Sequence, residues 1–198
     1  MTLSFTLFDT AIGRCAIAWR GRCVVRLQLP EDNDAKTRAR VLQRHPAARE
    51  AAPPRQIAQV LNAVATLLRG TPSDLSFIMI DMEGLPIFHR HVYQAARAIP
   101  FGAAVTYGEL ARQAGVPGAA RAVGQALARN PFAIIVPCHR VLAAGGKIGG
   151  FSANGGAATK LRLLAIEGYK IGPAKSLEKW LRENHAPSLF DSPASADV

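Results

Sequence analysis

Cysteine and long apolar runs are scarce in this sequence, and each shortage excludes a class of protein. The three cysteines (Cys15, Cys23 and Cys138) are an odd, widely spaced set that makes no disulfide framework, so we expect a reducing, cytoplasmic setting. No apolar run has the length that a bilayer requires, and the first residues lack the basic region of a secretory signal. We therefore expect no membrane partner.

The same scarcity argues against a metal centre. Cys15 and Cys23 lie eight residues apart with no histidine converging on them, whereas structural zinc usually requires four ligands. We expect neither a metal nor another cofactor.

Acidic residues are scarce in one part of the chain. Residues 1–88 hold 11 basic and 8 acidic residues (11 − 8 = +3), whereas residues 89–172 hold 10 basic and 2 acidic residues (10 − 2 = +8). Residues 173–198 hold 3 basic and 4 acidic residues, a net −1. A local excess of this kind is typical of a protein that binds nucleic acid. Alternatively, the positive charge alone would be explained if the proteins of the source organism are generally basic and rich in arginine.

The order of the predicted elements indicates an α+β fold. Short stretches rich in β-formers, separated by Gly13 and by the turn at 20–22, predict strands at 5–8, 15–19, 23–29 and, further on, 75–80. Apolar spacing and helix-terminating residues predict helices at 35–44, 56–68, 86–99, 106–114, 119–129 and 157–167. Paired glycines predict a short hairpin between residues 145 and 150.

These elements divide the chain into three segments. Residues 1–85 form a small β-rich domain, and residues 86–172 form a helical domain that contains Cys138. Residues 173–198 are rich in Pro, Ser and Ala and are expected to be a partly disordered tail with a helical turn at 177–181.

Two of the predicted helices form a helix-turn-helix candidate, because a tight turn with glycine joins 106–114 to 119–129. Thr106 is the expected N-cap of the first, with Glu109 completing a capping box. The second consists mostly of small residues, among which Arg121 is the one long cation within 119–128. Small side chains let a helix backbone approach a surface closely. Helix propensity and tight helix packing are the alternative explanation.

Cys138 lies in the most informative motif, Ile134-Ile-Val-Pro-Cys-His-Arg-Val141. A cysteine is nucleophilic as its thiolate, which a neighbouring cation or histidine favours. Pro137 donates no hydrogen bond, so we expect a buried strand to stop there and to present the thiol at its end. A buried structural cysteine is the alternative.

Several motifs together are typical of one family. The matching stretches are Phe101-Gly102, Val105-Thr-Tyr107, Ala119-Ala-Arg-Ala-Val-Gly124, Asn130-Pro131, Pro137-Cys-His-Arg-Val141, Gly149 to Ser152 and Glu167-Gly168. In this order and spacing the sequence resembles the O6-alkylguanine-DNA alkyltransferases, also called methylated-DNA–protein-cysteine methyltransferases. The resemblance implies a ribonuclease H-like N-terminal domain and a helix-turn-helix domain. It implies a monomer that transfers an alkyl group once, without cofactor, from guanine O6 in duplex DNA to its own cysteine. Activity on O4-alkylthymine and cooperative assembly on DNA stay open.

The resemblance also assigns the residues that perform the transfer. Cys138 is the acceptor, and His139 activates it through a bridging water while Glu167 holds the other ring nitrogen. Asn130 ties the turn around the cysteine. Tyr107 presses on the phosphate of the target base and donates a proton or hydrogen bond to the departing guanine. From the residues alone, Glu167 reads as a surface charge and Tyr107 as a core aromatic.

Other residues would bind the DNA and the flipped base. Arg121 is the finger that replaces the extruded nucleotide in the stack. The remaining members of this predicted set are Thr106, Val141, Gly149, Phe151 and Ser152. Phe151 stands where the family commonly has tyrosine. The sequence also departs from the family pattern in a segment 151–158 that is about two residues longer, and in Ala133, where some relatives have proline.

Two other functions fit parts of the sequence. One is a non-catalytic protein that marks alkylated DNA, although such relatives lack the acceptor cysteine that is present here. The other is a Cys-His hydrolase unrelated to DNA, which leaves the net +8 segment and the Arg121 helix unexplained.

Overall fold

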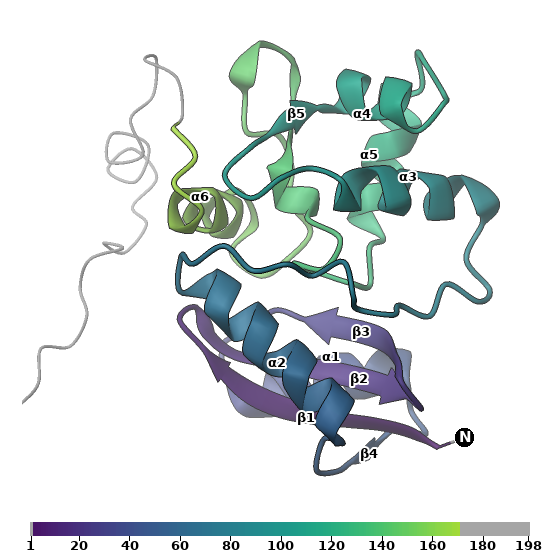
Figure 1. The fold of residues 1–198 in the computed structure, drawn as a ribbon, viewed down its shortest axis with the longest axis vertical. Coiled ribbons are helices and arrows are strands. Elements are labelled where there is room, and N and C mark those ends of the chain that lie inside the picture. The colour runs from purple at the N-terminus through teal and green to yellow at the C-terminus, as the bar shows by residue number, and fades with distance from the viewer. Residues whose placement is uncertain (1, 171–198) are drawn as a thin grey trace, which may run out of the picture.

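A computed structural model describes residues 2–170 and has a mixed α+β architecture (Figure 1). The predicted tail 173–198, including the helical turn at 177–181, lies outside the described residues. The N-terminal elements are β1 (Leu3–Thr10), β2 (Gly13–Arg20), β3 (Cys23–Gln28), α1 (Asp34–Arg44), β4 (Arg49–Glu50) and α2 (Arg55–Leu68). The C-terminal elements are α3 (Ile87–Arg97), β5 (Val105–Thr106), α4 (Tyr107–Gln113), α5 (Ala120–Ala128), the 3-10 helix η1 (Cys138–Arg140), β6 (Val141–Leu142), the 3-10 helix η2 (Ala144–Gly146) and α6 (Gly156–Ile166).

The predicted meander is confirmed as the centre of a four-stranded sheet with the order β3-β2-β1-β4. β1 and β2 pair antiparallel from Leu3 opposite Arg20 to Thr10 opposite Gly13, and β2 pairs antiparallel with β3. Gly13 has φ +117°, a backbone conformation that glycine adopts without steric cost at the tight turn between β1 and β2. Sequence analysis missed β4, a two-residue strand that pairs parallel with β1.

Both faces of this sheet are buried, which explains the nearly continuous apolar sequence of β2. Side chains alternate across a strand, so Ile17 and Trp19 join the core that also contains α2, while Ala16 and Ala18 face the opposite side. There they pack with Val41 of α1. Figure 1 shows α2 in front of the sheet and α1 behind it.

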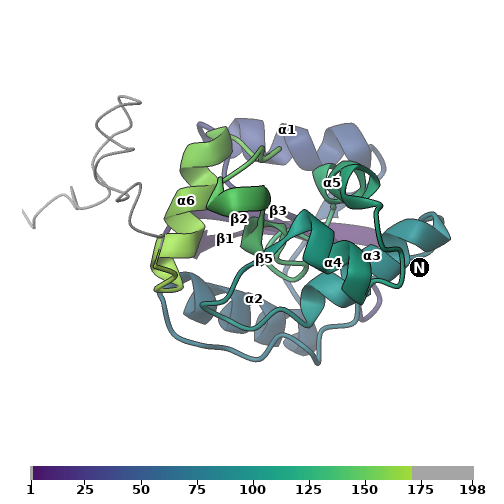
Figure 2. The same ribbon diagram turned by 90° about the horizontal axis from the view of Figure 1, so that it is seen from above.

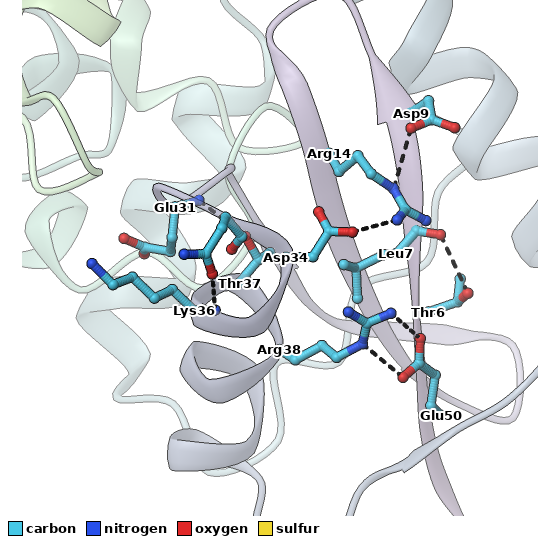
Figure 3. Close-up of polar contacts among 11 residues, drawn as sticks. Thr6, Leu7, Asp9, Arg14, Glu31, Asp34, Lys36, Thr37, Arg38 and Glu50 are labelled. Atoms are coloured by element: carbon cyan, nitrogen blue, oxygen red, sulfur yellow. Dashed lines mark hydrogen bonds and ion pairs between the residues drawn. The ribbon is translucent and has the colours of Figure 1, made fainter.

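Surface ion pairs fasten α1 to the edge of the sheet (Figure 3). Arg38 of α1 binds both carboxylate oxygens of Glu50 in β4, at 2.9 and 3.2 Å. Arg14 of β2 pairs with Asp9 at 3.2 Å and with Asp34 at the start of α1. The sequence therefore positions α1 through its buried Val41 and through charges on its exposed side.

The C-terminal layer contains the predicted helices, with ends within one or two residues of expectation. The capping box is confirmed: Glu109 N donates to Thr106 Oγ1 at 3.2 Å, and Thr106 N donates to the Glu109 carboxylate at 2.6 Å. One hydrophobic core joins this layer to the sheet, with residues such as Tyr93 and Leu110 in the same cluster as Leu27. Within the described chain, no helix is long and apolar enough to cross a membrane.

Two predictions of strand structure are wrong. Residues 75–80 form a loop with a single bridge from Ile80 to Val24, because Arg97 Nη2 donates to the carbonyls of Leu75, Ser76 and Ile78 at 3.0 to 3.1 Å. Together with the local bond from Ile78 N to Leu75 O at 3.2 Å, these bonds hold the segment in a turned conformation that forms no ladder. Residues 145–150 form no hairpin, since the chain turns through η2 and β6 pairs in parallel with β5 instead.

Candidate active site

Cys138 is held by a tight turn and not by the strand that sequence analysis predicted. Ile134 has φ +68°, a left-handed conformation that is uncommon for a branched residue. The side chain of Asn130 stabilises this turn: its Nδ2 donates to Val136 O and its Oδ1 accepts from Phe132 N, both at 2.9 Å. The turn replaces the strand because Asn130 and local backbone hydrogen bonds, such as Val136 N to Phe132 O at 2.8 Å, satisfy the polar groups.

Behind the cysteine, His139 and Glu167 form a buried pair. His139 Nε2 and Glu167 Oε1 are 2.8 Å apart, and both side chains are 1% exposed. Sequence analysis expected this contact from the family pattern, and the structure contains it. When Nε2 carries the proton and donates it to the carboxylate, Nδ1 is left as an acceptor.

His139 Nδ1 is buried and has no hydrogen-bond partner among the described residues. Buried polar atoms are nearly always satisfied, so this nitrogen is free to accept a hydrogen bond from a water molecule or a reacting group. Burial lowers the pKa of His139, and the neighbouring carboxylate of Glu167 only partly opposes this effect. The ring is thereby kept neutral and able to accept a proton.

Arg140 completes the cluster and was not among the predicted site residues. Its Nε and Nη2 bind the two oxygens of Glu167 at 2.8 and 2.9 Å, and its Nη1 binds Ile99 O at 2.6 Å. Burial alone would raise the pKa of Glu167, but the hydrogen bonds from His139 and Arg140 outweigh burial and bring the value down to about 2. The carboxylate is charged at any physiological pH. The motif Pro-Cys-His-Arg contained the signal for Arg140.

Sequence analysis also missed Lys160, a fully buried lysine on α6. Its Nζ donates to Val141 O at 2.6 Å and lies 5.7 Å from the centre of the Tyr107 ring. Burial lowers the pKa of Lys160 to about 8, and the negative charge of a Cys138 thiolate opposes that shift. The signal was present in the helical spacing, because Lys160 lies seven residues before Glu167 and therefore on the same side of α6.

The thiol of Cys138 is subject to opposing effects. Burial raises its pKa, while hydrogen bonding to Asn130 and the charge of Lys160 lower it. Thiolate formation therefore depends on a base that removes the proton and on a nearby positive charge that lowers the thiol pKa. His139 and Lys160 can supply these two functions.

Tyr107 lies between α5 and the segment that follows η2. A Cβ on Gly124 would lie 3.7 Å from the Tyr107 ring, and one on Gly149 would lie 3.6 Å from it. The small residues of α5 thus allow close packing against this aromatic ring. Burial, followed by the charge on Cys138, raises the pKa of Tyr107, so its hydroxyl stays protonated.

Of the other predicted residues, two line a groove that reaches Cys138. Phe151 and Ser152 line this groove of about 1300 Å³ together with the thiol. Val141 is buried in β6, and its carbonyl accepts from Lys160 while keeping a second lone pair. Thr106 is occupied as the cap of α4. Arg121 is exposed in the first turn of α5 and makes no ion pair with any residue from 2 to 170.

The comparisons with known proteins point to one family. Residues 87–169 match the family described as "6-O-methylguanine DNA methyltransferase, DNA binding domain". The methylated-DNA–protein-cysteine methyltransferase of Mycobacterium leprae is 37% identical over 163 residues, which cover 82% of this chain and 91% of that protein. The protein of the same name from Salmonella typhimurium is 54% identical over 84 residues, 42% of this chain and 48% of that protein.

Solved structures extend the likeness to the whole fold. The crystal structure of Mycobacterium tuberculosis OGT in complex with DNA has a TM-score of 0.67 and 33% identity, covering 83% of this chain and 92% of that chain. The O6-methylguanine-DNA methyltransferase of Pyrococcus kodakaraensis has a TM-score of 0.62 and 28% identity, covering 84% and 99%. The chain therefore belongs to the methylated-DNA–protein-cysteine methyltransferase family.

Proposed function

We propose that this protein repairs DNA by direct reversal, moving the alkyl group of O6-alkylguanine irreversibly onto its own Cys138. The observation that carries the proposal is the orphaned, buried Nδ1 of His139, next in sequence to the half-buried thiol and fixed from behind by Glu167. This arrangement supplies a nucleophile, a base and the group that orients the base. The family to which the chain belongs acts by this chemistry.

The reaction balances without a cofactor. A water between Cys138 and His139 takes the thiol proton and passes one to Nδ1, because adjacent residues do not hydrogen-bond each other directly in such a turn. The thiolate attacks the alkyl carbon, the carbon–sulfur bond forms and the bond from that carbon to guanine O6 breaks. The electron pair leaves with the guanine, which takes a proton from the Tyr107 hydroxyl. The thioether is stable, so each molecule acts once.

Lys160 stabilises the two anionic stages of this reaction. Its charge lowers the pKa of the Cys138 thiol, and its Nζ lies 5.7 Å from the centre of the Tyr107 ring. A buried cation lowers the free energy of the thiolate before attack and of a tyrosinate after proton donation. Asn130 acts earlier, by holding the turn that aims the sulfur.

The base must leave the duplex to reach this buried thiol. α4 and α5 serve as a helix-turn-helix whose small residues approach the minor groove, and Arg121 fills the vacated stack. The backbones of Cys138, Val141 and Ser152 read the guanine edge. Phe151 supplies an aromatic wall, and Thr106 and Gly149 border the path of the nucleotide.

The finer features of the fold and setting belong to the same proposal. The strand order is β3-β2-β1-β4, in which β2 pairs antiparallel with both β1 and β3, and β4 pairs parallel with β1. This topology supports a ribonuclease H-like N-terminal layer. Residues 1–85 and 86–172 remain the proposed domains. We propose a monomer that acts in the cytoplasm. Whether it also acts on O4-alkylthymine, and whether it binds DNA cooperatively, are questions that separate measurements would answer.

Intact mass tests the function directly. After incubation with duplex DNA that carries O6-methylguanine, the protein should gain one methyl group per molecule, located at Cys138. Binding without a mass change would indicate the lesion-marking alternative, and turnover of a small ester or amide would indicate a hydrolase. Nothing in the comparisons favours either alternative.

A further inference from the structure

The groove that reaches Cys138 extends far beyond the active site. It passes between the two layers of the molecule, and its other wall is formed by β3 and α1. Seen from above, α1 and α5 lie along the same side of the molecule (Figure 2), and residues of both line this groove. Arg129, at the end of α5, borders it opposite α1.

The N-terminal wall of this groove is strongly basic. Lys36, Arg40 and Arg44 line it at intervals of four residues, which is a rise of about 6 Å per step along one side of α1. Arg26 of β3 lies beside this row. Burial, followed by the like charges of Arg44 and Arg40, lowers the pKa of Arg26 to about 10.

Carboxylates compensate only part of this charge. Glu31, Asp81 and Glu83 also line the groove, and two of them are engaged: Glu31 lies 3.8 Å from Arg40, and Asp81 lies 3.3 Å from Arg20. Lys36 is also paired, with Asp32 at 2.6 Å. Within residues 2–170, neither Arg26 nor Arg44 forms an ion pair. The Arg26 guanidinium instead donates to the neutral amide oxygen of Gln28 at 2.7 and 3.2 Å.

Arg26 and Arg44 lie among other cations and form no ion pair within residues 2–170. Like charges crowded together in this way repel one another, and this repulsion is relieved when an anion binds. A row of cations along a helix fits an extended polyanion better than a small ion. The groove also adjoins the exposed side of α5, where Arg121 and Arg129 lie. One DNA molecule lying along α5 would therefore meet the basic wall of α1.

We propose that the N-terminal layer carries a second DNA-contacting surface, in which Arg26, Arg40 and Arg44 bind backbone phosphates of the duplex. This inference rests on the proposed function, which places duplex DNA along α5. The N-terminal layer thereby adds affinity that does not depend on sequence. It also braces the DNA on the far side of the groove from the extruded base.

The test compares two double variants that remove the same charge. Arg40→Ala/Arg44→Ala removes two cations from the groove. Arg49→Ala/Arg55→Ala removes two exposed arginines of β4 and α2 that lie outside it and make no ion pair with residues 2–170. Affinity for an undamaged duplex is measured over a salt series. Each lost phosphate contact should make the slope of log K against log salt shallower by about 0.9.

We expect the groove variant to bind DNA more weakly and its slope of log K against log salt to be shallower by about 2. The matched control should keep the wild-type slope. Equal effects in both variants would overturn the inference, because net charge alone would then explain them. Weaker binding with an unchanged slope would also overturn it, because phosphates would not be the contact.

Reaction with free O6-benzylguanine base separates this surface from the active site. Both variants should react with the free base at the wild-type rate. If the groove variant reacts with the free base more slowly than the wild type, the single substitution Arg44→Gln at an exposed position replaces it in the salt series. An unchanged slope of log K against log salt for Arg44→Gln would then overturn the inference. If the wild-type protein binds DNA but gains no mass from methylated DNA, the proposed alkyl transfer is wrong. The proposed DNA-contacting surface is not affected by that result.

Discussion

Charged side chains serve different purposes in the two halves of this molecule. In residues 2–85 they pair on the surface, as Arg14 does with Asp34 and Arg38 with Glu50. In residues 86–170 the ion pairs all belong to one buried cluster, in which Glu167 binds His139 and Arg140. Exposed pairs contribute little to stability, whereas a buried charge that loses its partner is costly. The same residue types thus link exposed elements in one half and orient the proposed base, His139, in the other.

The largest expected effect comes from Cys138→Ser, which should abolish alkyl transfer while DNA binding persists. Only a thiolate is nucleophilic enough near neutral pH, and the proposed DNA surface lies mainly elsewhere. Intact mass and duplex affinity measure the two properties separately. Cys15 cannot substitute, because burial raises its pKa to about 12. Transfer through Cys15 or Cys23 would contradict the assignment of the acceptor.

The contrast between buried and exposed ion pairs predicts the next effect. Glu167→Gln should lower the free energy of unfolding by about 3 kcal/mol, because Arg140 and His139 lose a charged partner in the interior. The matched variant Glu50→Gln should lose far less, since its pair with Arg38 is exposed to solvent. Urea denaturation of both variants measures the difference. Similar losses would show that burial does not distinguish the two pairs.

The same cluster sets the stability of the wild-type protein in acid. The pKa of Glu167 is depressed in the folded state, to about 2, from an ordinary value of 4.5. Its contribution is therefore fully present above about pH 4.5 and is lost as the pH falls towards 2. Denaturation midpoints of wild type and Glu167→Gln should converge over that interval, and a constant difference would contradict the assigned shift.

Arg121→Ala should slow repair of duplex DNA far more than reaction with a free O6-alkylguanine base. Extruding a base costs a few kcal/mol, and the planar guanidinium of Arg121 can replace the base in the stack. A free base has no stack to leave. The control Arg55→Ala removes an exposed cation from α2, outside the proposed DNA surface, and should affect both substrates little. If Arg121→Ala lowers the rates with duplex DNA and with the free base equally, Arg121 does not replace the extruded base.

Local sequence predicted the helices and the meander because these depend on apolar spacing, caps and glycine at turns. It failed at residues 75–80 and at residues 134–136, where apolar β-formers take loop conformations. In both places a distant or neighbouring polar side chain decides the outcome: Arg97 binds three carbonyls of the first segment, and Asn130 closes the second. The residues of each segment alone do not indicate that these side chains will bind it.

The candidate site shows the same division. The family motif located Cys138, His139 and Glu167, but no motif reasoning singled out Lys160, whose meaning depends on the tertiary packing of α6 against Tyr107. A lysine within an apolar helix has two interpretations from sequence alone. It can reach the surface with its long stem, or it can be buried as a functional charge. Only the packing of the neighbouring elements decides between them.

The smallest expected effect is on the pH dependence of transfer in Lys160→Met. Removing this charge should raise the pKa of the Cys138 thiol, because Lys160 lowers it in the wild type. A higher thiol pKa leaves less thiolate at neutral pH, so the rate with free base should fall there and recover as the pH rises. In the wild type the benefit should fade above about pH 8, as Lys160 loses its proton. The control Arg162→Met removes the same charge from the outer side of α6 and should leave the profile unchanged. A uniform loss of rate at every pH would assign Lys160 to packing and to the Val141 carbonyl, and not to the charge of the thiol.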